Sequence, residues 1–181
     1  MVLDSPNLRL SIEHGTGTLW LGFPGEPVNA LDLGRLRELD SAIEAIAVCG
    51  TVRVLVLRSA KPAGFSAGLL SESLESMPHP TQRANFAWYG QQVFDRLARL
   101  DAASVAVIDG PCLGVGLELA LACDYRVCVA RPTTHLGFPD RGACFGGSAR
   151  LRELVGRRST ELIASGETLS GREARTLGFV D

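Results

Sequence analysis

Short apolar runs recur along the chain at lengths that suit buried β-strands. Three of them are rich in β-branched residues and are bounded by loop or helix sequence: VRVLVLRS at 52–59, SVAVIDG at 104–110 and YRVCVAR at 125–131. Near the start, LRLSIEH and TLWLGF flank the turn GTG, so residues 8–23 are predicted to form a β-hairpin.

Helical spacing of apolar residues fills the stretches between these strands. Over 33–49 the leucines and isoleucines recur every three or four positions, Asp32 can cap the start of a helix, and Gly50 can end it. Residues 81–100 predict another helix, and the last fifty residues are predicted to be mostly helical. Because strands that alternate with helices form βαβ units, we expect an α/β fold with a mainly parallel sheet.

Composition narrows the class of protein. The chain has 181 residues, of which 46% are hydrophobic and 21% charged, so it can bury a full core as one domain. A net charge of −2 without a basic cluster argues against a nucleic-acid partner. No apolar run is long enough to span a bilayer, so we expect no membrane partner. The start of the chain does not have the pattern of a secretion signal.

Five cysteines include no CxxC pair, and three scattered histidines offer no metal-ligand spacing. We therefore expect reduced, mostly buried thiols in a cytoplasmic protein, with no metal.

One stretch carries chemistry beyond this pattern. The segment DGPCLGVGLELALACDYRV, residues 109–127, joins a predicted strand to a helix at 115–123 through a glycine-rich turn. The first N–H groups of a helix have no partner inside it and favour anions, including an oxyanion that forms only during a reaction. Glu118 falls in the first turn of that helix. Burial would raise its pKa and the helix start would offset the rise, which suits a general acid or base.

A purely structural interpretation of this stretch is also available, because glycine turns are common connections and a glutamate is favourable in a first helical turn. The turn has neither the Gly-Lys-Ser/Thr of a phosphate loop nor GxGxxG. A second loop, GFSAGLL at 64–70, also follows a predicted buried strand. Two such loops can direct two backbone N–H groups at one oxygen, each worth about 3 kcal/mol in a transition state.

Together with these motifs, several further segments resemble the crotonase superfamily, the enoyl-CoA hydratases and isomerases. They are NALDLGRLRELDSAI, VRVLVLRS, GFSAGLL, VIDGPCLGVGLELALACDYRV, GFPD and ASGETLSGREARTLGFVD, and they occur in the family's order over nearly the whole chain. The resemblance implies the crotonase fold, an α/β architecture of repeated ββα units also found in Clp-type proteases. It further implies an acyl-CoA thioester substrate, with CoA as part of the substrate and no separate cofactor.

The resemblance also assigns an oxyanion hole. Its donors would be the backbone N–H groups of Leu69, just after SAG, and Val115, within LGVG. Ala67, Gly68 and Gly114 would line the substrate-binding site. The two N–H groups would stabilise the thioester enolate.

Two carboxylates complete the implied site. Glu118 matches the first of the two catalytic glutamates of the hydratases, and Asp140, in GFPD, matches the second, which the family carries in G-x-P-E. In hydration the two acids hold and activate a water and deliver one proton to the α-carbon. In isomerisation a single acid can move the proton between carbons.

The chain departs from the family pattern near these residues. Asp140 is one methylene shorter than glutamate, which withdraws the carboxylate by about 1.5 Å and can cost about a hundredfold in rate. The stretch DRGACFGGSARL is about four residues shorter than usual, in a loop that shapes the acyl pocket. Val115 replaces the middle of three glycines, and Leu70 stands where the family often has an acid.

The sequence ends at Asp181, where family members continue into helices that cover the acyl pocket. We therefore expect one crotonase-like domain over 1–181 without this helical lid. Exposed apolar surface and the family's habit favour a homo-oligomer, a trimer or hexamer.

Two functions remain in competition. One is an enoyl-CoA hydratase/isomerase-like enzyme, and the other is a non-catalytic partner subunit or acyl-thioester binding protein of the same fold. A sealed acyl pocket beside Glu118 would favour the enzyme, whereas a pocket filled by Leu69, Leu70 or Phe145 would favour the binding protein.

Overall fold

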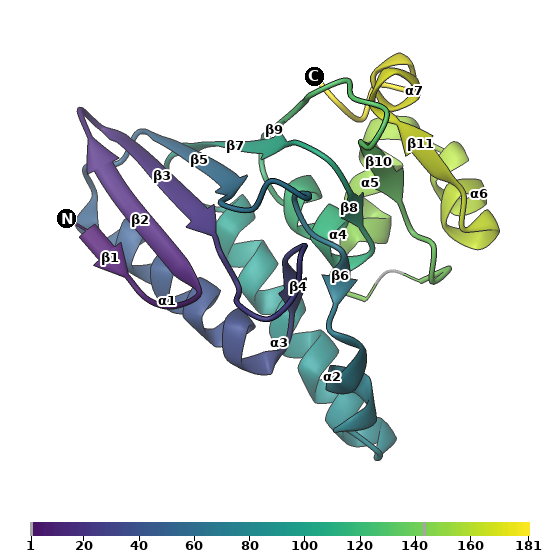
Figure 1. The fold of residues 1–181 in the computed structure, drawn as a ribbon, viewed down its shortest axis with the longest axis horizontal. Helices are drawn as coiled ribbons and strands as arrows, with labels where there is room; N and C mark the ends of the chain where they lie inside the picture. Colours follow the sequence, from purple (N-terminus) through teal and green to yellow (C-terminus); the bar gives the residue numbers. More distant parts are fainter. Residues whose placement is uncertain (1, 143) are drawn as a thin grey trace.

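The computed structural model describes residues 2–142 and 144–181 and arranges them around one large and two small sheets (Figure 1). The larger sheet has six strands in the order β1-β2-β3-β5-β7-β9. Their bounds are Val2–Asp4, Leu8–Glu13, Thr16–Leu21, Val54–Ser59, Ala103–Ile108 and Tyr125–Cys128. β3, β5, β7 and β9 run parallel, while β1, β2 and β3 are antiparallel neighbours. The predicted hairpin, the three apolar strands and the mainly parallel sheet are confirmed.

The smaller sheets lie where the glycine loops meet. One has the order β11-β10-β8, and the other pairs β4 with β6. Their bounds are β4 Ala30–Leu31, β6 Gly68–Leu69, β8 Cys112–Leu113, β10 His135–Gly137 and β11 Thr168–Ser170. A single parallel bridge between Ser66 and Cys112 links the β6 segment to the β8 segment. These strands are two or three residues long, too short to show the alternation that predicts a strand, and the sequence did not reveal them. Two of them, β10 and β11, lie in the last fifty residues, which are less than half helical, so the prediction that this stretch is mostly helical is wrong.

Seven helices complete the described part of the chain. They are α1 Leu33–Cys49, α2 Ser71–Glu75, α3 Pro80–Ala98, α4 Val115–Leu121, α5 Gly147–Val155, α6 Arg158–Ser165 and α7 Gly171–Thr176. The predicted capping of α1 is confirmed: Asp32 Oδ1 accepts the N–H of Arg35 at 2.8 Å, and Gly50 ends the helix in the left-handed conformation. No helix in this part of the chain is long and apolar enough to cross a membrane.

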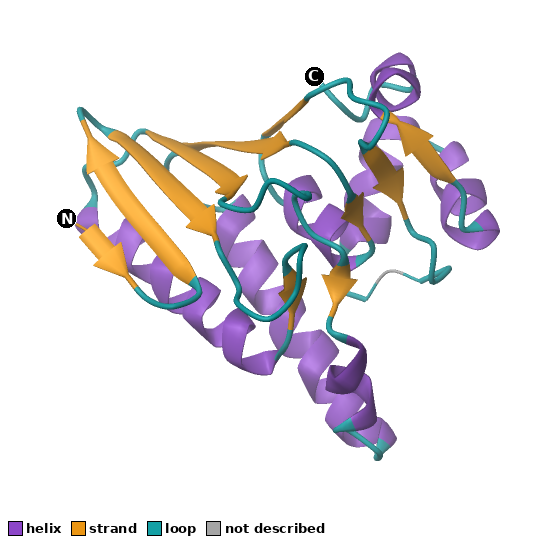
Figure 2. Ribbon diagram, in the orientation of Figure 1, coloured by secondary structure: helices purple, strands orange, loops and turns teal. Residues whose placement is uncertain are grey.

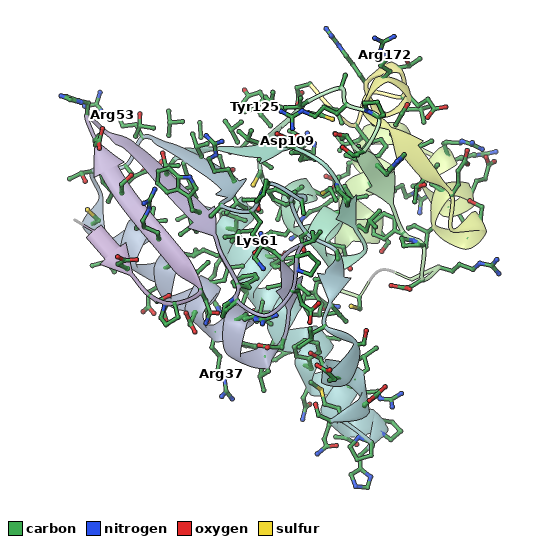
Figure 3. All side chains as sticks on the ribbon, in the orientation of Figure 1. Arg37, Arg53, Lys61, Asp109, Tyr125 and Arg172 are labelled. Atoms are coloured by element: carbon green, nitrogen blue, oxygen red, sulfur yellow. The ribbon has the colours of Figure 1, made fainter. Side chains whose placement is uncertain are left out.

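Helices α1 and α3 pack on one face of the larger sheet (Figure 2). Alternate strand residues on that face, such as Leu55, Leu57 and Ile108, are fully buried. At the edge strand β9 the opposite alternation is exposed: Tyr125, labelled in Figure 3, is 52% accessible, and Val127 is 46% accessible. All five cysteines are free thiols, but only two are buried, so the expectation of mostly buried thiols is wrong.

A buried asparagine ties the sheet to the first glycine loop. Asn29 has no exposed surface, and its side-chain amide donates to the carbonyls of Leu21 and Phe65 and to the hydroxyl of Ser59. Its side-chain oxygen accepts the N–H of Phe23 at 3.0 Å. These four bonds connect the end of β3, the end of β5 and the loop before β6, so they set where that loop lies.

Replacing Asn29 with alanine should lower the free energy of unfolding by about 3 kcal/mol, because buried backbone groups would lose their partners. Denaturant unfolding followed by circular dichroism measures the change. Asn85→Ala, at an exposed position of α3, is the matched control and should cost far less. Equal losses in the two variants would contradict the role of Asn29.

Candidate active site

The two glycine loops pack backbone against backbone. Gly64 and Gly110 both have positive φ angles, and a Cβ on Gly110 would lie 2.8 Å from the Cα of Gly64. The N–H groups of Phe65 and Ser66 both donate to the carbonyl of Pro111, at 2.9 and 3.0 Å. Such close contact leaves no room for side chains, which explains why both loops carry glycine at the crossing.

The contact continues to the residues predicted to form the oxyanion hole. A Cβ on Gly68 would lie 3.1 Å from the carbonyl oxygen of Leu113 and 3.5 Å from the nitrogen of Val115. Leu69 follows Gly68 directly, so the structure brings the two predicted donor segments together. Gly68 and Gly114 are buried, whereas Ala67 is exposed beside them.

The start of α4 offers an unused donor. The N–H of Gly114 donates to the carbonyl of Gly137, and the N–H groups of Leu117 and Glu118 donate back to the carbonyl of Gly114. Within residues 2–142 and 144–181, the N–H of Val115, the first residue of the helix, makes no hydrogen bond. That N–H is available to a ligand oxygen.

Glu118 lies inside the protein with no exposed surface. Its Oε1 accepts the N–H of Cys144 at 2.9 Å, and its Oε2 accepts the N–H groups of Phe145 and Gly147, both at 2.7 Å. A Cβ on Gly147 would lie 2.4 Å from the Cγ of Glu118, so only glycine allows this approach.

Burial raises the pKa of Glu118, and the N–H groups of Gly147, Cys144 and Phe145, followed by the charge of Arg150, lower it in part. The predicted direction is confirmed. The source of the compensation differs from the prediction, which placed it at the start of the helix that carries Glu118. The donors instead belong to the start of α5 and the residues before it, which the sequence did not mark as partners.

Phe145 fills the space between this carboxylate and α3. Its ring is fully buried and meets the rings of Phe86 and Phe94 edge to face, with centroids 5.3 and 5.2 Å apart. A Cβ on Gly90 would lie 2.4 Å from the Phe145 ring. Leu69 and Leu70 are half-buried and do not take this place.

Asp140 lies on the solvent side of the second glycine turn. Its side chain is exposed, and its Oδ2 lies 3.9 Å from the position of a Cβ on Gly114. The structure therefore brings both predicted acids to the same turn, one buried behind it and one at the surface. Their catalytic roles stay predictions.

A hollow of about 240 Å³ opens beside the predicted oxyanion donors. It is lined by Glu26, Pro27, Val28, Ala30, Ala67, Leu69, Leu70, Ser71 and Glu72. Lys61, in the loop after β5 (Figure 3), donates to the carbonyl of Glu26. Arg35 donates to the carbonyls of Pro24 and Ala30 at 2.8 and 2.7 Å. The wall of the hollow is thus held by two cationic side chains.

A metal centre has no support in the described residues, since no group of three or more His, Cys, Asp or Glu side chains in them is placed to hold an ion.

The sequence profile of the enoyl-CoA hydratase/isomerase family matches residues 23–181. The fatty acid oxidation complex subunit alpha of Vibrio cholerae serotype O1 is 39% identical over 172 residues, and the match covers 90% of this chain and 24% of that protein. The same subunit of Vibrio campbellii is 37% identical, with 93% and 25% covered. The chain therefore spans about a quarter of the length of these curated relatives.

Solved structures agree with the sequence match. An enoyl-CoA hydratase of Geobacillus kaustophilus HTA426 superposes with a TM-score of 0.93 at 29% identity, covering 99% of this chain and 69% of that one. An enoyl-CoA hydratase of Thermoplasma volcanium GSS1 gives a TM-score of 0.89 at 29% identity, covering 98% and 71%. The predicted crotonase fold is confirmed.

The raised pKa of Glu118 predicts how stability depends on pH. The folded chain holds this proton to higher pH than the unfolded chain, so the stability linked to Glu118 is fully present below the unfolded pKa. That stability is lost as the pH rises through the folded pKa. Glu118→Gln cannot ionise, and its amide faces N–H donors, which lowers stability at every pH. The free energy of unfolding of the parent should therefore exceed that of the variant most at low pH, and this difference should decrease as the pH rises.

Denaturant unfolding of both proteins between about pH 4 and about pH 8 measures this difference. Glu44→Gln, at an exposed position of α1, accounts for the loss of one negative charge. A difference that increases with pH would mean that the three N–H bonds lower the pKa of Glu118 by more than burial raises it.

Proposed function

The chain belongs to the enoyl-CoA hydratase/isomerase family, and from that premise we propose that it acts on an acyl-CoA thioester through an enolate held in an oxyanion hole. The observation that carries this proposal is the meeting of the Gly68 and Gly114 turns beside Glu118. Preorganised N–H donors that face a developing negative charge supply a large part of many rate enhancements.

The oxyanion hole consists of the N–H groups of Leu69 and Val115. A thioester carbonyl that accepts both bonds gains negative charge on its oxygen when a nucleophile adds to the β-carbon or when a base removes the α-proton. Because these donors are fixed by the crossing of two glycine loops, they need no reorganisation when the charge appears. CoA enters only as part of the substrate, so no separate cofactor takes part.

Glu118 is the acid/base of the proposed reaction. Its raised pKa brings proton exchange closer to neutral pH than that of an ordinary glutamate, which suits general acid–base catalysis. In hydration, Glu118 and Asp140 together hold a water, one carboxylate takes its proton as the oxygen bonds to the β-carbon, and one proton goes to the α-carbon. In isomerisation, Glu118 alone carries a proton from one carbon to the other.

The substrate's thioester end fits the hollow beside Ala67 and Leu69. A second, larger hollow of about 770 Å³ lies between α1, α2 and α3, and its apolar lining includes Leu33, Met77 and Phe86. The smaller hollow includes Ala30 and Leu69 of the β4–β6 pair, and the larger one begins at Asp32, directly after β4. In the proposal the acyl chain extends from the first hollow toward the second.

A second function, acyl-thioester binding without catalysis, is favoured by one observation. Phe145 fills the space beside Glu118, and Glu118 itself has no exposed surface. A substrate water would reach this carboxylate only after a movement of the residues that cover it. In this alternative the chain serves as a partner subunit that holds a thioester, and turnover is absent.

Self-association and location belong to the same proposal. The exposed apolar side chains Tyr125 and Val127 on the edge strand β9 suit contact with further copies of the chain, as a trimer or hexamer. Five free thiols suit the reducing cytoplasm.

Hydration of crotonyl-CoA, followed by the loss of the conjugated thioester absorbance, tests the enzyme against the binding protein. Glu118→Gln should lower kcat by about 10²–10⁴-fold.

Asp140→Glu should raise the hydration rate by up to about a hundredfold, because it restores the missing methylene. Asp140→Asn is the matched control and should not raise it. Thioester binding without turnover in the parent would favour the non-catalytic function.

The proposed donor at Val115 can be removed without removing the helix. Val115 is the first residue of α4, a position that tolerates proline, and proline has no N–H. Val115→Pro should lower kcat by about 10²–10³-fold, whereas Val115→Ala, which keeps the N–H, should lose much less. Equal activity of the two variants would exclude this N–H from the oxyanion hole.

A further inference from the structure

The carboxylate of Glu118 is held by a segment that is itself held from α3. Gln91, on α3, donates from Nε2 to the carbonyl of Cys144 at 2.8 Å. Arg150 donates to the carbonyl of Phe145 at 3.1 Å and pairs with Asp95, which is also on α3. The Phe145 ring fits against α3 where Gly90 leaves space. One face of this segment therefore meets α3, and its N–H groups meet Glu118.

The contact made by Gln91 is connected directly to Glu118. The carbonyl of Cys144 and the N–H of Phe145 belong to the same peptide group, and in a planar trans peptide they point in opposite directions. Gln91 donates to that carbonyl, and that N–H donates to Glu118 Oε2 at 2.7 Å. A chain of hydrogen bonds thus runs from Gln91 through one peptide group to the carboxylate.

Such a chain has a chemical consequence. A donor on the carbonyl polarises the peptide group and makes its N–H a stronger donor, by about 10–30% per bond. The same bond fixes the orientation of the peptide plane, because the Gln91 amide is partly buried and the neighbouring Phe145 ring is packed against α3. Arg150 does not act in this way, since the peptide group that it contacts carries the N–H of Gly146.

We propose that Gln91 is a positioning residue. Through the peptide group between Cys144 and Phe145, Gln91 orients the carboxylate of Glu118 and stabilises its ionised form. The catalytic importance of this role rests on the proposed function of Glu118 as acid/base. The hydrogen-bonded link from Gln91 to the carboxylate exists whether or not Glu118 is catalytic. Neither the family match nor the glycine loops assign a role to Gln91.

Other charged and titratable groups surround the carboxylate. Arg150 acts on it from α5, and burial together with the charge of Glu118 raises the pKa of the Cys144 thiol to about 12. Asp140 lies across the Gly114 turn, and Asp95 faces Arg150. A substitution at Gln91 leaves all of these groups in the chain, so its effect on Glu118 can be read separately.

Gln91→Met tests the proposal. Methionine has nearly the size of glutamine and favours helices, so α3 should fold, but methionine cannot donate to the Cys144 carbonyl. The limb of the pH–rate profile that belongs to Glu118 should move upward by about half a pH unit. The direction is the same whether Glu118 acts as base or as acid, because the ionised form loses support in either case.

A second readout does not depend on turnover. The backbone amide signal of Phe145 in ¹H–¹⁵N spectra should follow the ionisation of Glu118, and the titration should be absent in Glu118→Gln. Its midpoint should rise in Gln91→Met by the same amount as the kinetic limb. If the parent does not hydrate crotonyl-CoA, the proposed function fails, and this amide titration still decides the role of Gln91.

Two further variants complete the test. Gln92→Met, at the neighbouring half-buried position of α3, is the matched control and should titrate like the parent. Gln91→Lys keeps a donor, and its midpoint should not exceed that of the parent. A Gln91→Met midpoint equal to the parent's, or a Gln91→Lys midpoint raised as much as that of Gln91→Met, would overturn the proposal and leave Gln91 a purely structural role.

Discussion

A carboxylate without access to solvent must receive hydrogen bonds from the protein, and this constraint organises the centre of the molecule. Glu118 has no exposed surface and obtains three backbone N–H groups from the residues around the start of α5. The helix that carries Glu118 is therefore fixed to a segment more than twenty residues later in the chain. That segment in turn depends on α3, through Gln91 and the pocket for Phe145. The loss of any of these contacts would leave a charge buried with fewer partners, which is far more costly than the loss of an ordinary surface bond.

The second constraint is steric. Two loops can present N–H groups to one oxygen only if their backbones approach within van der Waals contact, and side chains at the crossing would prevent this. Glycine at 64, 68 and 110 removes the obstacle, and Gly114 supplies the positive φ of the turn. Gly114 precedes α4 and Glu118 lies in its first turn, so the glycine crossing and the buried carboxylate are only four residues apart in the chain.

The sequence predicted the features that depend on local pattern. Apolar periodicity located α1 with both caps, and β-branched runs located β5, β7 and β9. The glycine turns and Glu118 were recognisable because strand, turn and helix are contiguous there. The partners of Glu118 were not recognisable, since the N–H groups of Cys144, Phe145 and Gly147 belong to any sequence and only the fold brings them near. The two glycines at the start of α5, Gly146 and Gly147, were the available signal, because glycine allows a close backbone approach. Asn29 was equally hidden: it lies in a quoted motif, but its four bonds join segments that only the fold brings together.

The bonds of Asn29 have a consequence for local motion. They join residues up to 36 positions apart, so the loop before β6 shares its hydrogen bonds with the ends of β3 and β5. Many ligand-binding loops fluctuate independently of the scaffold that carries them. Here, releasing the loop from Asn29 would also free groups at the ends of the inner strands β3 and β5, so opening of the loop would require part of the larger sheet to open as well. Slow exchange of the amide hydrogens of this loop with solvent would reflect the stability of the sheet rather than that of the loop alone.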